Sequence, residues 1–185
     1  MCHIKKPNNT TLININIFPL IGIDIENVGK VNLGLNKAEV LKRLGLPSQN
    51  SNEKQFYYDH LEFRIDFDHF DHVEFIEFIY GPFPEKTHLL LYNIDPFGIG
   101  ADSLKNILSI ENNGKVDESE AEFAYSFLNI SVGVWRDLTP ELVEESILEM
   151  KLNGEYEENK SWLLEDLEKA KNFWTIGIGI PSYYS

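Results

Sequence analysis

The sequence has little that would mark a disulfide-rich secreted scaffold, a membrane protein or a common class of enzyme. Its single cysteine, Cys2, excludes an internal disulfide framework. No apolar run approaches the roughly 18 residues of a membrane-spanning helix. There is no Gly-x-Ser-x-Gly nucleophile elbow, and "IGIGIP" stops at Gly-x-Gly before Pro181, short of a phosphate-binding loop. The sequence therefore predicts no catalytic residues and no cofactor.

Basic residues are also scarce, with 16 Lys and Arg against 30 Asp and Glu, which gives a formal net charge of -14. Such a field repels nucleic acid and anionic membranes, because both are bound through Lys and Arg. It attracts a basic protein and speeds the encounter, although solubility alone accounts for the charge equally well. The N-terminus has two lysines but no apolar stretch of signal-peptide length, which predicts a cytoplasmic protein.

Six segments have the pattern of β-strands, most of them through alternating apolar and polar residues and 72–84 through apolar residues on both faces. These segments are 11–29, interpreted as two strands broken near Pro19, and 55–68, 72–84, 87–94, 122–137 and 173–185. Helical spacing of apolar residues predicts four helices between them, each with a capping residue at its start. The expected caps are Asn36, Asp102 or Ser103, Thr139 and Ser161. Short helices packed on one face of antiparallel sheets place the chain in the α+β class.

Two of the alternating segments match at a constant offset of 67 residues (123 minus 56, and so on to 134 minus 67). The matched positions are Phe56, Tyr58, Leu61, Phe63, Ile65 and Phe67 with Phe123, Tyr125, Leu128, Ile130, Val132 and Val134. We interpret this as a diverged duplication within a single compact domain, 1–185. The first repeat covers 30–81, and the second covers 98–184 with a helical insertion at 139–172. Chance similarity of two amphipathic strands is the alternative.

The segment "LGLNKAEVLKRLGLP", residues 33–47, followed by aromatic strands and "VEFIEF", resembles a bacterial module. That module occurs in the small outer-membrane assembly lipoproteins and, duplicated in tandem, in the β-lactamase inhibitor proteins. Leu33-Gly34 and Leu44-Gly45-Leu46-Pro47 match its motif, while Asn36 replaces the usual threonine. The module carries no catalytic residues, so the resemblance implies a protein that presents a sheet surface to a partner. In its acidic, single-domain character the chain is also similar to immunity proteins that neutralise bacterial toxins.

The stretch "DFDHFDHVEF", residues 66–75, holds three aspartates, one glutamate and two histidines. Histidine and carboxylate side chains that converge can hold a metal ion, so one hypothesis is a metal-binding protein or metal-dependent hydrolase centred on residues 66–74. A calcium loop, however, needs a glycine and regular oxygen spacing, and neither is present. We therefore interpret the stretch as a solvated turn between two strands, with no metal.

Strand alternation places Asn129, Ser131, Gly133 and Trp135 on one face, as counterparts of Glu62, Arg64, Asp66 and Asp68. A tryptophan on a polar face is a reasonable anchor for a partner. The predicted partner-binding residues are Glu62, Asp66, Asp68, Asp71 and Trp135. Gly133, Gly177 and Gly179 lie opposite the apolar rows of their strands, where glycines allow close approach. We expect the inserted helices to pack there.

These observations favour a protein without enzymatic activity that binds a basic protein partner, and neither nucleic acid nor membrane. The resemblances make the expectation more specific. They imply an immunity or inhibitor protein that neutralises a basic bacterial toxin domain such as a nuclease.

Overall fold

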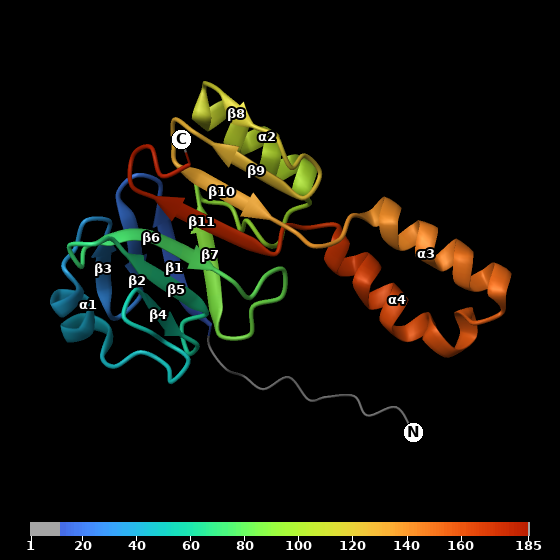
Figure 1. Ribbon diagram of the computed structural model, residues 1–185, viewed down its shortest axis with the longest axis horizontal. Helices are drawn as coiled ribbons and strands as arrows, with labels where there is room; N and C mark the ends of the chain where they lie inside the picture. The colour runs from blue at the N-terminus through green and yellow to red at the C-terminus, as the bar shows by residue number, and fades with distance from the viewer. Residues whose placement is uncertain (1–11, 185) are drawn as a thin grey trace.

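The computed structural model describes residues 12–184, so Cys2 and His3 lie outside the described part of the chain. Its elements form two β-sheets, two helices beside them and a helical hairpin that extends away from both sheets (Figure 1). Helices and antiparallel sheet segments together confirm the α+β class. Among residues 12–184, none of the helices is long and apolar enough to cross a bilayer.

The first sheet has four strands in the order β3-β2-β1-β7. Their bounds are β1 Ile13–Phe18, β2 Gly22–Ile25, β3 Gly29–Asn32 and β7 Thr87–Leu91. The first three form an antiparallel meander, and the predicted break near Pro19 is the turn between β1 and β2. β7 pairs with β1 in parallel, Ile13 opposite Thr87. The expectation of purely antiparallel sheets is therefore wrong at this one pairing, which joins strands far apart in the sequence.

The second sheet has seven strands in the order β4-β5-β6-β11-β10-β9-β8, all paired antiparallel. Their bounds are β4 Gln55–Tyr58, β5 Phe63–Phe67, β6 Val73–Phe78, β8 Val116–Asp117, β9 Ala124–Phe127, β10 Val132–Trp135 and β11 Thr175–Gly179. The three-stranded meanders β4-β5-β6 and β8-β9-β10 are joined by β11, which lies between β6 and β10. The internal duplication stays a prediction.

Each segment of the proposed duplication, 55–68 and 122–137, is a hairpin and not the single strand expected from its alternation. Their turns contain Glu62 (φ 59) and Ser131 (φ 49), both in the left-handed region. The apolar residues also change phase within each segment. In the first segment they occupy even positions up to Tyr58 and odd positions from Leu61, so one uninterrupted strand could not keep them on one face.

Two of the four helix starts follow the sequence prediction. α1, Lys37–Leu44, is capped by Asn36, whose side chain accepts a hydrogen bond from Ala38 N at 2.9 Å. α3, Pro140–Asn153, is capped by Thr139 and ends at Gly154, which has the left-handed φ of 78°.

The other two starts were predicted wrongly. α2, Ala101–Asn112, begins after Gly100, so Asp102 lies in its first turn and caps nothing. α4, Tyr156–Ala170, begins after Glu155, and Ser161 therefore lies inside the helix. Acidic residues in the first turn support both starts through the helix dipole, and no side-chain cap is needed.

Both sheets contribute to one apolar core. Ile15, Ile23 and Leu89 of the first sheet lie in the same buried cluster as Phe63 and Ile76 of the second. Leu104 and Leu108 of α2 join it near β9. Since the core uses one face of the seven-stranded sheet, the other face is turned away from it.

Candidate partner-binding face

The face of the seven-stranded sheet turned away from the core, called here the open face, carries a row of paired residues across six strands. The pairing runs Tyr57, Arg64, Glu77, Gly177, Gly133 and Ser126. Charged side chains occupy β5 and β6, and glycines occupy β11 and β10. The middle of the face therefore has a charged half beside a half without side chains.

In the charged half, one arginine forms ion pairs with two carboxylates. Arg64 Nη2 lies 3.1 Å from Glu77 Oε2, and Arg64 Nε lies 3.4 Å from Asp66 Oδ1. Within residues 12–184, neither Arg64 Nε nor Asp66 Oδ1 makes a hydrogen bond. Burial raises the pKa of both Asp66 and Glu77, and the attraction of Arg64 opposes it. A further positive charge at this place would favour the ionised carboxylates.

The glycine half is filled by the end of the chain, which turns back over the sheet (Figure 1). Tyr183 stacks on Phe75 with ring centroids 4.5 Å apart and planes 4° from parallel. The Tyr184 ring lies over Gly133 and reaches Gly177, at positions that a Cβ atom would occupy. The glycines do admit a close neighbour, as predicted, but that neighbour is a pair of tyrosines. The expectation that the inserted helices pack there is wrong.

We expect Gly177→Ala to lower the free energy of unfolding by about 1–3 kcal/mol, because the new methyl group would overlap the Phe75 ring and approach the Tyr184 hydroxyl. Urea denaturation measures this. In a Phe75→Ala background the methyl group has room, so the same substitution should cost clearly less. An equal cost in both backgrounds would contradict the packing described here.

Trp135, at the end of β10, borders a hollow in the open face of about 250 Å³. The hollow is also lined by Arg64, Glu77 and Tyr184. Trp135 is 40 % exposed, and its ring meets Trp174 edge to face with centroids 6.1 Å apart. A partly exposed tryptophan held by a second ring beside a hollow is a typical anchor for a protein partner.

The structure separates the five predicted partner-binding residues. Asp66 and Trp135 lie on the open face, although Asp66 is largely buried in the Arg64 network. Glu62 is only 2 % exposed, and its carboxylate accepts hydrogen bonds from the backbone of residues 85–87. Glu62 therefore cannot present its charge to a partner.

Asp68 and Asp71 lie in the β5–β6 turn, away from the open-face row. Asp68 Oδ1 accepts hydrogen bonds from the Phe70 and His72 amides at 2.8 and 2.9 Å, which holds the pKa of this carboxyl below its ordinary value. Asp71 lies 3.5 Å from Lys37 Nζ and 3.7 Å from Lys54 Nζ. The two lysines thus neutralise the negative charge of Asp71 in this turn.

The same turn is the place of the metal hypothesis. Among residues 12–184, the structure brings together no group of three or more His, Cys, Asp or Glu side chains able to hold a metal ion. His69 instead packs on Phe70, with ring centroids 3.8 Å apart. Residues 68–72 form a turn between β5 and β6 that is closed by Asp68.

Sequence reasoning missed the aromatic part of the open face. Phe75, Trp174, Tyr183 and Tyr184 all lie on it or at its border. The glycine row was the available signal, since three glycines on one face require something close to cover them. The sequence could not say which segment does so, because the tyrosines follow a turn at Pro181.

Comparison of the chain with family models, curated proteins and solved structures found no match.

Proposed function

We propose that this chain is a non-enzymatic protein-binding protein that inhibits a basic partner, as an immunity protein inhibits a basic toxin domain such as a nuclease. The observation that carries the proposal is the open face. There the half-exposed Trp135 borders a hollow lined by Arg64 and Glu77, which belong to a network of one arginine and two carboxylates. A basic protein would bury the tryptophan and supply a further positive charge.

The overall charge supports the same class of partner. With a net charge of -14, the chain attracts a basic protein over a distance and orients it before contact. The resemblance to tandem inhibitor modules and to immunity proteins gives further support, because both classes act by covering a partner with a preformed surface. A protein acting in this way needs no catalytic group of its own.

The direct test uses the proteins encoded next to this chain's gene. We expect one of them to be basic, to bind the purified chain in isothermal titration calorimetry, and to lose its own activity when bound. The proposal is contradicted if none of these proteins binds, or if binding leaves the activity of the bound protein unchanged.

Trp135→Ala should weaken that binding about tenfold or more, because truncation removes the aromatic wall of the hollow that the partner would contact. Leu46→Ala, at an exposed position just after α1, is the matched control and should leave the affinity unchanged. Titration calorimetry of both variants against the same partner measures the difference. Similar affinities for the two variants would show that the open face is not the contact surface.

A further inference from the structure

The helical hairpin formed by α3 and α4, called here the arm, offers a second surface, separate from the open face. α3 and α4 pack on each other through Val143 and Leu163, and Figure 1 shows the pair extending away from the body. Several large apolar side chains on the arm are exposed, namely Leu142, Leu148, Leu152, Trp162 and Leu164. Two of them, Leu142 and Trp162, border one hollow, and apolar side chains that gather at a hollow indicate a binding site.

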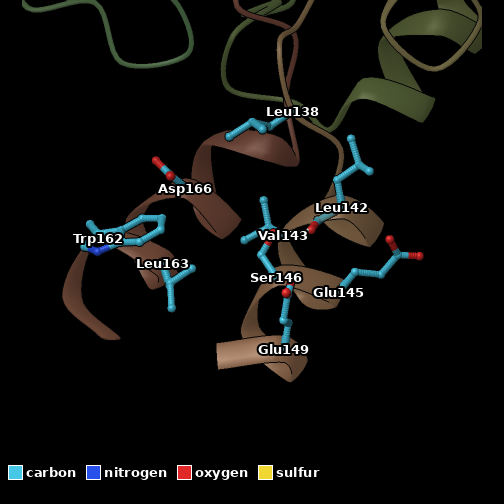
Figure 2. A pocket seen from close by; sticks show the side chains of 9 residues that line it. All are labelled: Leu138, Leu142, Val143, Glu145, Ser146, Glu149, Trp162, Leu163 and Asp166. Atoms are coloured by element: carbon cyan, nitrogen blue, oxygen red, sulfur yellow. Dashed lines mark hydrogen bonds between the residues drawn. The ribbon is translucent and has the colours of Figure 1, made fainter. Parts of the chain in front are cut away.

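One side of the arm is hollowed into a groove of about 390 Å³. Its floor is apolar, with Val143 from α3 and Leu163 from α4, and Leu138 closes the end nearest the sheets (Figure 2). Leu142, 41 % exposed, and Trp162, 44 % exposed, border it from opposite helices. The Trp162 ring is held in place by a hydrogen bond from its Nε1 to Asn159 Oδ1 at 2.9 Å.

The rim of this groove is acidic. Glu145 and Glu149 on α3 and Asp166 on α4 line it, and its lining includes no lysine or arginine. None of the ion pairs among the described residues involves these three carboxylates. Lys169 and Lys171 pair instead with Glu165 and Glu168. The rim charges are therefore available to a ligand.

The spacing of the lining residues along α3 gives the length of the groove. Leu142, Ser146 and Glu149 are separated by four and three residues, so one face of α3 borders the groove over two helical turns. A groove of that length with an apolar floor takes the apolar face of a helix. The acidic rim requires that helix to carry lysine or arginine beside its apolar residues.

We propose that the arm groove binds a basic amphipathic helix of the partner protein. Apolar side chains of that helix contact Leu142, Val143 and Trp162, and its Lys or Arg side chains pair with Glu145, Glu149 and Asp166. The inference rests on the proposed function for the partner being a basic protein, and it adds a second contact site with its own chemistry. A synthetic helical peptide can test binding at the groove, and the result of that titration does not depend on the natural partner.

The probe is a synthetic peptide of Leu and Lys arranged on opposite faces of a helix, titrated into the full chain. We expect amide chemical shifts in α3 and α4 to move, and we expect a scrambled peptide of the same composition to bind about tenfold more weakly. Trp162→Ala should weaken binding of the amphipathic peptide about tenfold, since it removes the aromatic wall. Binding that perturbs only the open face, or no binding, would overturn the inference.

Two charge-matched triple variants separate the groove from general attraction to an acidic protein. Glu145→Gln/Glu149→Gln/Asp166→Asn neutralises the rim, and Glu53→Gln/Glu120→Gln/Glu144→Gln removes the same charge from exposed positions outside it. The rim variant should weaken peptide binding about tenfold, and the outer variant less than about twofold. Equal losses in the two variants would assign binding to the net charge and reject the groove. Circular dichroism of both variants confirms that the arm helices are retained.

Discussion

Glu62→Ala is expected to lower the free energy of unfolding by about 3–5 kcal/mol, the largest effect of any single substitution considered for this chain. The buried carboxylate accepts hydrogen bonds from Glu85 N at 2.8 Å, Lys86 N at 3.2 Å, and Thr87 N and Oγ1 at 3.0 and 2.7 Å. Truncation leaves the two Thr87 donors without this acceptor in the interior and the Glu85 and Lys86 amides without it nearer the surface, and hydrogen bonds to a charged group are the strong ones. The β4–β5 turn would lose its hydrogen bonds to the segment at the start of β7. Urea denaturation followed by circular dichroism measures the loss.

Two further substitutions at the same position divide this effect into its parts. Glu62→Gln keeps one acceptor oxygen, so it should cost less than Glu62→Ala. Glu62→Gly loses the acceptors but relieves the left-handed φ of 59°, and it should be about 1 kcal/mol more stable than the alanine variant. If Glu62→Ala costs less than about 1 kcal/mol, the carboxylate does not have the stabilising role assigned to it.

Arg136→Ala is expected to cost about 2–4 kcal/mol, the second largest effect. The Arg136 side chain, in a residue 9 % exposed, donates from Nε to Glu122 O at 2.7 Å and from Nη1 to Ala170 O at 2.9 Å. Ala170 is the last residue of α4, where helix carbonyls lack partners and carry partial negative charge. One guanidinium therefore fastens the end of the arm to the turn before β9. Thermal and urea unfolding measure the cost.

Arg136→Lys provides the control for charge. Lysine keeps the positive charge but cannot span both carbonyl oxygens with a planar fork, so we expect a loss between those of wild type and alanine. Hydrogen exchange at α4 amides should be faster in both variants, because the anchored end of the helix is released. Unchanged exchange in α4 together with a full loss of stability would place the effect of Arg136 in the body and not at the arm.

The parts of the fold that follow local rules were predictable from the sequence. Asn36 and Thr139 cap their helices because each combines a capping side chain with a suitable first turn. The strand faces were predictable too, since side chains alternate along each strand. The two hairpins were predicted as single strands because the change in the phase of alternation was not considered. In the first hairpin this change falls between Tyr58 and Leu61.

Long-range features were not predictable in the same way. The parallel pairing of β1 with β7 joins segments that are separated in the sequence by β2 to β6 and α1, and no local pattern encodes it. Glu62 looked like a surface charge because its hydrogen-bond donors lie more than twenty residues away. The sequence therefore predicts part of the candidate site. Trp135 and Asp66 follow from strand alternation, whereas the positions of Tyr183 and Tyr184 depend on how the segment after β11 folds back.

The edge-to-face contact of Trp135 with Trp174 has a consequence for affinity. Trp135 ends β10 shortly before the arm begins, and Trp174 follows the arm just before β11. The open face therefore lies next to the base of the arm, within reach of one partner of ordinary interface size. A partner that binds both proposed sites would meet the second at high effective concentration, and two weak contacts would combine into one long-lived complex. Selection could then tune the lifetime of that complex through the arm while the sheets stay unchanged.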